Sequence, residues 1–149
     1  MRAILQVTLF LSLFSSPLLA QVAVFWQPGF PTVASQPIDR ATLSTALNGL
    51  NPTFLDLRAL QSPGALSNSK LLVLPYGSVV PTDNWKTIEA YLQRGGNLLV
   101  LGGQPLRVPV TQIDGNFVQG RPQDSYSRIL DVRHTYEVPV SKDAHFTWR

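Results

Sequence analysis

The sequence predicts an α/β fold, with a mostly parallel sheet packed between helices and a less regular segment towards the C-terminal end. Three observations lead to this class. Short apolar runs occur without polar interruption, which is typical of strands buried on both faces. Stretches with apolar residues at helical spacing lie between these runs. Clusters drawn from the 12 prolines and 10 glycines separate the two kinds of segment, and such clusters commonly end regular structure.

Residues 1–20 are predicted to be a signal peptide. Arg2 is the only charged residue among them, an apolar centre follows it, and Ala20 provides a small residue at the expected cleavage position. The apolar centre is shorter than the roughly 20 residues that a membrane-spanning helix needs. We therefore expect an exported protein, periplasmic or extracellular, with no membrane contact after cleavage. An uncleaved N-terminal anchor is the alternative.

The next part of the chain shows a strand, a helix and a second strand. Residues 22–26 form a continuous apolar run. Residues 39–50 carry leucines at helical spacing, and Asp39 is placed to cap the start of that helix. A second strand is predicted over 53–57. Residues 61–69 have the composition of a loop.

A strand, a helix and a further strand then follow in the clearest pattern of the chain. The strands are predicted over 71–74 and 97–101. Thr82 or Asp83 is placed to cap the helix between them, and Gly95-Gly96 ends it. Because a crossover between strands of one sheet is right-handed, two strands joined by a helix are expected to be parallel.

Periodicity weakens in the last forty or so residues. A hairpin is predicted around Asp114-Gly115, a dipeptide that favours tight turns. A short helix is predicted over 125–130, and a strand over 133–138. The predicted organisation is therefore a signal peptide, an α/β domain over 21–110 and an extension over 111–149. Because the chain ends on an aromatic stretch, we expect further structure to follow it in the natural protein; a short docked terminal strand is the alternative.

Composition excludes several classes of function. The chain has no cysteine, so it has no disulfide, no cysteine-ligated metal and no thiol nucleophile. The formal charge of +3 comes without a basic run, and we therefore expect no nucleic-acid partner. The glycine pairs lack the spacing of phosphate-binding loops, and we expect neither a cofactor nor a metal.

The candidate binding site lies where the predicted parallel strands end. In an open parallel sheet, ligands bind in the crevice beyond the carboxyl ends of the strands. Gln27, Tyr76, Ser78 and Gln104 follow three of these strands and offer amides, a hydroxyl and an aromatic ring. Such groups hydrogen-bond to and stack on a polar ligand such as a sugar. The alternative is that these residues are ordinary turns.

Two other groups of residues suggest a hydrolase. Gly77-Ser78 is similar to a serine elbow, although Tyr76 and Val80 occupy the positions where that motif has glycine. His134, Glu137 and His145 could serve a catalytic or metal-binding role, but their spacing alone is not specific. Solvated surface residues are the alternative for this second group.

Residues 70–104 carry a resemblance to a known superfamily. The run Lys-Leu-Leu-Val-Leu-Pro-Tyr-Gly-Ser, a helix ending Tyr-Leu-Gln-Arg-Gly-Gly-Asn, and the run Leu-Leu-Val-Leu-Gly-Gly together resemble class I glutamine amidotransferase-like domains. The closest likeness is to the versions found beside glycoside hydrolases, such as the β-galactosidase trimerisation domain. The likeness extends over about residues 22–110. It implies a flavodoxin-like three-layer sandwich.

The resemblance implies a domain without catalytic activity. Catalytic members carry a cysteine nucleophile after a central strand, where this chain has Leu101-Gly-Gly-Gln104, and their His-x-Glu pair is not matched by His134-Thr-Tyr-Glu137. The implied function is that of an accessory domain in an exported carbohydrate-active protein. It would assist assembly, as a homo-oligomer or with a downstream catalytic domain, or bind a polar or glycan ligand. A hydrolase (glycoside or ester) using Ser78 or the histidine–carboxylate group, or a fragment of a larger glycoside hydrolase, is the alternative.

Overall fold

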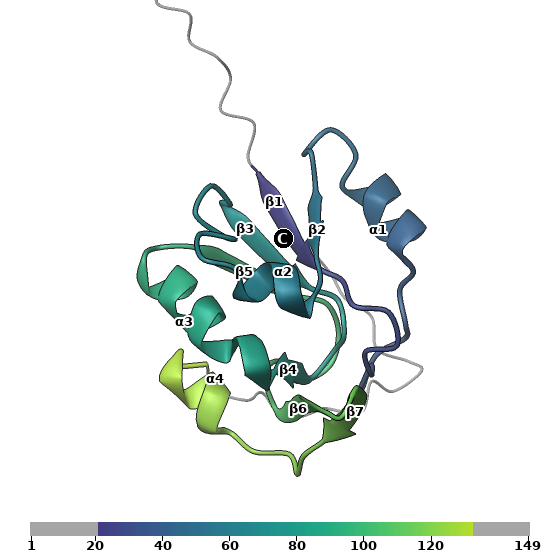
Figure 1. Ribbon diagram of the computed structural model, residues 1–149, viewed down its shortest axis with the longest axis vertical. Helices are drawn as coiled ribbons and strands as arrows, with labels where there is room; N and C mark the ends of the chain where they lie inside the picture. The colour runs from purple at the N-terminus through teal and green to yellow at the C-terminus, as the bar shows by residue number, and fades with distance from the viewer. Residues whose placement is uncertain (1–20, 133–149) are drawn as a thin grey trace, which may run out of the picture.

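A four-stranded parallel sheet forms the centre of the protein. The computed structural model describes residues 21–132. The strands lie in the order β2 (Thr53–Leu55), β1 (Val22–Phe25), β3 (Leu71–Leu74) and β5 (Asn97–Val100), and each neighbouring pair is parallel (Figure 1). The prediction of an α/β protein with a parallel sheet is therefore confirmed.

The two middle strands are buried on both faces. All four residues of β1 are buried, as are the last three of β3. Ala23 of β1 lies opposite Leu72 of β3 on one side and opposite Thr53 of β2 on the other. Their uninterrupted apolar sequence is what double burial requires, because each side chain of the strand, on either face, meets other apolar groups.

Two clusters of apolar side chains pack on the sheet. One joins Phe25, Leu72 and Leu74 to the helices α2 (Leu57–Gln61) and α3 (Trp85–Gln93). The other joins strand residues to α1 (Arg40–Ala46) through Leu43, and its strand members are Val22, Val24 and Val73. Alternate residues of a strand point to opposite faces, so odd and even positions of β1 enter different clusters.

A second, smaller sheet is built beyond the end of β3. It contains β4 (Val79–Pro81), β6 (Val108–Ile113) and β7 (Asn116–Gln119), with β4 parallel to β6 and β6 antiparallel to β7. The predicted hairpin is confirmed, and both of its turn residues, Asp114 and Gly115, have positive φ.

The ends of two predicted elements are wrong. The helix predicted over 39–50 stops at Ala46, although Asp39 caps it as expected by accepting a hydrogen bond from Thr42 N at 2.7 Å. The strand predicted to reach Leu57 stops at Leu55, because Asp56 accepts a hydrogen bond from Ala59 N at 2.7 Å and begins α2 there.

The cap predicted for the start of α3 is wrong, whereas the glycine stop predicted for its end is confirmed. Thr82 lies in the short 3₁₀ helix η1 (Thr82–Asn84) and donates to Val110 O at 2.8 Å, while Asp83 accepts from Gln112 N at 2.8 Å. Both side chains therefore tie η1 to β6. At the other end, Gly95 N donates to Leu92 O, and the positive φ of Gly95 stops the helix.

The last described helix is α4 (Ser125–Ile129), which confirms the prediction of a short helix there. Its Tyr126 ring packs edge-on against Trp85 of α3, with 5.0 Å between ring centroids. The signal peptide and the strand predicted over 133–138 lie outside the described residues. Among residues 21–132, the helices are all too short or too polar to cross a bilayer.

Candidate functional site

The structure separates the four predicted crevice residues into two pairs. Gln27 follows β1, Tyr76 and Ser78 follow β3, and Gln104 follows β5, so all four lie beyond carboxyl ends of parallel strands, as expected. Gln27 bonds with Tyr76, however, and Ser78 bonds with Gln104. Each pair has a different environment.

The pair of Gln27 and Tyr76 joins two turns. The Tyr76 hydroxyl accepts a hydrogen bond from Gln27 N at 2.8 Å and donates one to Gln27 O at 3.1 Å. The Gln27 Oε1 atom accepts from Leu57 N at 3.2 Å. Burial raises the pKa of the Tyr76 hydroxyl, and the hydrogen bond with Gln27 lowers it by less. These polar groups are engaged within the protein.

The Tyr76 ring is part of an aromatic cluster rather than an open platform. It is 6% exposed and contacts Phe25, Trp26 and Phe30, at ring-centroid distances of 5.5, 6.0 and 5.0 Å. The contacts with Phe25 and Phe30 are edge-to-face and the contact with Trp26 is stacked, and aromatic packing of both kinds stabilises the core. In this structure, Tyr76 therefore offers no free ring face of the sort that sugar stacking requires.

The pair of Ser78 and Gln104 lies at a second position, under the turn that follows β5. The Ser78 Oγ atom accepts a hydrogen bond from Gln104 N at 2.8 Å. The backbone carbonyl oxygen of Ser78 accepts hydrogen bonds from Arg107 N at 2.9 Å and Val108 N at 2.8 Å, and the backbone N–H of Ser78 donates to Val33 O at 2.9 Å. Ser78 is thus a junction between three loops.

Two glycines allow these loops to approach closely. A Cβ atom on Gly77 would lie 2.0 Å from Val33 O, and one on Gly103 would lie 2.4 Å from Ser78 Oγ. Both glycines have positive φ, of 70° and 61°. Any side chain at either position would separate the loops that hold Ser78.

A cleft of about 310 Å³ opens beside Ser78. Arg107 carries the only charge among its lining residues, and Gln104 Oε1 accepts a hydrogen bond from Arg107 Nη1. The Arg107 Nε atom is buried, has no hydrogen-bond partner and lies 3.8 Å from Asp124 Oδ1, which is ion-pair distance. The cleft is lined by Val33, Ala34, Ser78, Gln104, Arg107, Val108 and Pro122.

Arg107 was not identified from the sequence. It follows a Gly-Gly-Gln-Pro-Leu stretch without periodicity, so no pattern places its side chain. The signal that could have found it is its position a few residues after the end of a predicted parallel strand, where ligand-binding groups gather.

Catalytic chemistry has few candidates in the described part of the chain. The described hydrogen bond to the Ser78 hydroxyl oxygen comes from a backbone N–H, not from a base. His134, Glu137 and His145 lie outside the described residues. Within residues 21–132, no group of three or more histidine or acidic residues is arranged to hold a metal ion.

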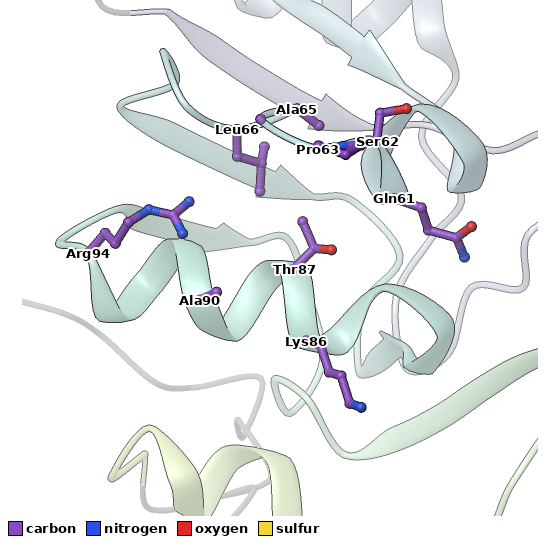
Figure 2. Close-up of a pocket in the computed structure, with 10 residues that line it drawn as sticks. Gln61, Ser62, Pro63, Ala65, Leu66, Lys86, Thr87, Ala90 and Arg94 are labelled. Atoms are coloured by element: carbon purple, nitrogen blue, oxygen red, sulfur yellow. The ribbon is translucent and has the colours of Figure 1, made fainter.

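A second cleft, of about 290 Å³, lies between α3 and residues 61–66. Lys86 and Arg94 are its charged lining residues. Figure 2 shows Arg94 extending towards Leu66 while Lys86 points away from the cleft. The two cations therefore do not converge on one point, and this cleft is a weaker candidate than the one beside Ser78.

Comparison with known proteins adds no relative. No protein-family model, no curated protein and no solved structure was found that matches the chain. The geometry of the cleft and the resemblance over residues 70–104 are therefore the basis for a functional proposal.

Proposed function

We propose that this chain is an exported, non-catalytic accessory domain of a carbohydrate-active protein, and that it binds a polar ligand in the cleft beside Ser78. In this proposal the domain is glutamine amidotransferase-like, with a flavodoxin-like three-layer sandwich. The parallel sheet, with helices packed through both apolar clusters, supports it. So does the position of the cleft beyond the ends of β3 and β5.

The observation that carries the proposal is the setting of Arg107. A guanidinium has five N–H donors in a planar fork, and it pairs with carboxylates through two parallel hydrogen bonds. Gln104 fixes one side of this fork, and the Nε donor has no hydrogen-bond partner. Asp124 Oδ1 lies 3.8 Å from Nε, so a ligand carboxylate would accept from the guanidinium N–H groups that Gln104 and Asp124 leave, through charge-assisted hydrogen bonds.

The chemistry of the cleft favours a glycan that carries a carboxylate, such as a uronic acid. The carboxylate would pair with Arg107, while Val33, Val108 and Pro122 offer apolar contacts for the C–H groups of a sugar ring. Asp124 Oδ1, at ion-pair distance from Arg107 Nε, helps to hold the guanidinium in place. A neutral glycan lacks the group that this fork recognises.

Calorimetric titration of the full chain with acidic and neutral oligosaccharides tests the proposal. We expect binding of the uronic-acid oligomer, and Arg107→Ala is expected to weaken it by about tenfold or more, because charge-assisted hydrogen bonds contribute roughly 1.5–3 kcal/mol. Arg121→Ala is the matched control, because Arg121 is exposed and outside the cleft. Equal binding of neutral and acidic oligomers, or equal effects of the two substitutions, would contradict the proposal.

An assembly role is the other part of the proposal. A domain of this kind would join copies of itself, or a downstream catalytic domain, to build the carbohydrate-active protein. The lack of cysteine supports the non-catalytic reading, because it removes the thiolate on which amidotransferase chemistry depends. The hydrolase alternative requires a base next to Ser78, and the 3%-exposed Ser78 is engaged with backbone groups.

A further inference from the structure

One edge of strand β5 is paired with no other strand of residues 21–132. The hydrogen bonds from Asn97 N to Lys70 O and from Leu101 N to Leu74 O show that odd-numbered residues of this segment face β3. Backbone groups of alternate residues point to opposite sides of a strand, so those of Leu98 and Val100 point outward. Within residues 21–132, no strand pairs with β5 on that side.

An apolar cavity of about 380 Å³ lies against the same two residues. Leu98 and Val100 line it with side chains from α3 and from the segments after β5 and α4, and every lining residue is apolar. They are Leu92, Leu98, Val100, Pro105, Leu106, Leu130 and Val132. An open edge beside an apolar cavity is the arrangement that accepts an additional strand.

The C-terminal end of the described chain lies at this cavity. Val132, the last described residue, lines the cavity. The preceding helix α4 packs on α3, as Figure 1 shows and as the contact between Trp85 and Tyr126 requires. A parallel strand placed beyond β5 after α4 would therefore repeat the hand of the β3–α3–β5 crossover, which is the hand that sheets prefer.

We propose that the free edge of β5 and its apolar cavity are the docking site for residues 133–138, as a fifth strand of the parallel sheet. The sequence Arg-His-Thr-Tyr-Glu-Val suits this position. Tyr136 and Val138 alternate with the polar Thr135 and Glu137, so one face of the strand meets the cavity. Pro139, which has no N–H, ends the pairing.

Amide hydrogen exchange of the full chain, followed residue by residue by NMR, tests this inference. We expect the amides of Leu98 and Val100 to exchange at least about 100-fold more slowly than unpaired amides, and to show contacts with Thr135–Glu137. Val138→Arg should remove this protection, because it places a charge in the cavity. Glu137→Arg is the matched control and should leave it unchanged.

Two readouts keep the result interpretable. Protection of Leu72 and Val73 in the middle of the sheet reports that the Val138→Arg variant is folded. Fast exchange of Leu98 and Val100 in the unaltered chain would overturn the inference. Protection that disappears on dilution, together with a dimer in light scattering, would also overturn it, because a second copy would then occupy the edge. Neither result depends on ligand binding beside Ser78.

Discussion

Single residues with unusual backbone requirements hold the loops around the cleft. Gly77 is the clearest case, since a side chain there would meet the carbonyl oxygen of Val33. Ser78, the next residue, then bonds to Val33, Gln104, Arg107 and Val108. The turn was predictable from its sequence, but the convergence of these loops was not, because residues 33, 78 and 104 are far apart in the chain and no periodic pattern links them.

Gly77→Ala is expected to lower the free energy of unfolding by more than about 3 kcal/mol, because it adds a backbone clash to the cost of positive φ. Gly115→Ala is the control. Gly115 also has positive φ, but a Cβ atom there would meet nothing within 4 Å, so a loss of only about 1 kcal/mol is expected. Chemical denaturation measures both. Similar losses at the two sites would show that the loops do not pack as described.

Tyr76→Phe should lower the free energy of unfolding by about 1–3 kcal/mol, because Gln27 N loses its acceptor while the ring remains. The pH dependence follows from the raised pKa of Tyr76. Its contribution to stability is complete below the ordinary tyrosine pKa of 10.0 and is lost as the pH rises through the folded-state value.

Stability measured from pH 8 to pH 11 tests this dependence. The unaltered protein should lose stability above pH 10, and the Tyr76→Phe variant should lose less of it. Burial also raises the pKa of Tyr91, so part of the loss of stability is expected to remain in the variant. Identical pH profiles for the two proteins would contradict the assigned environment of Tyr76.

At the scale of elements, the buried strands were the most predictable part. Double burial demands continuous apolar sequence, and the predicted run 71–74 agrees with β3 residue by residue. Helix α2 was missed because its five residues are too few to show a helical period. Strand β4 was missed because Val79-Val80-Pro81 is short and contains proline, which normally counts against a strand.

Asp56 decides where β2 ends and α2 begins. Asp56→Ala should lower the free energy of unfolding by about 1 kcal/mol, because Ala59 N loses its capping acceptor. Asp56→Asn should recover most of that loss, since asparagine also caps helices well. Thermal and chemical unfolding of the two variants measure the difference. An alanine variant as stable as the original would argue against this cap.

At the scale of the whole molecule, the cleft proposed to bind a ligand lies at one end of the parallel sheet. The parallel sheet brings the ends of β3 and β5 together, and the turns after them form the cleft with Arg107. The sequence located this edge of the sheet. It did not show that Gln27 and Tyr76 would be engaged with each other, because hydrogen bonding between turns depends on the packing of aromatic rings.

Export is a separate prediction for the whole chain. When the full chain is produced in a bacterium, we expect the mature N-terminus at Gln21, because Ala20 provides the small residue that precedes cleavage. Mass spectrometry of the intact secreted protein measures this. Ala20→Arg should retain residues 1–20. Export of a protein that still carries those residues would contradict the prediction of a cleaved signal peptide.

We propose above that the cleft beside Ser78 binds a polar, acidic ligand. An NMR titration of the full chain with a uronic-acid oligosaccharide tests it most directly, because backbone amide signals report the location of the ligand. We expect the signals of Ser78, Gln104, Arg107 and Val108 to shift together and saturate, while those of Leu72 and Leu98 stay in place. Saturable shifts confined to another surface, or no shifts at any ligand concentration, would contradict it.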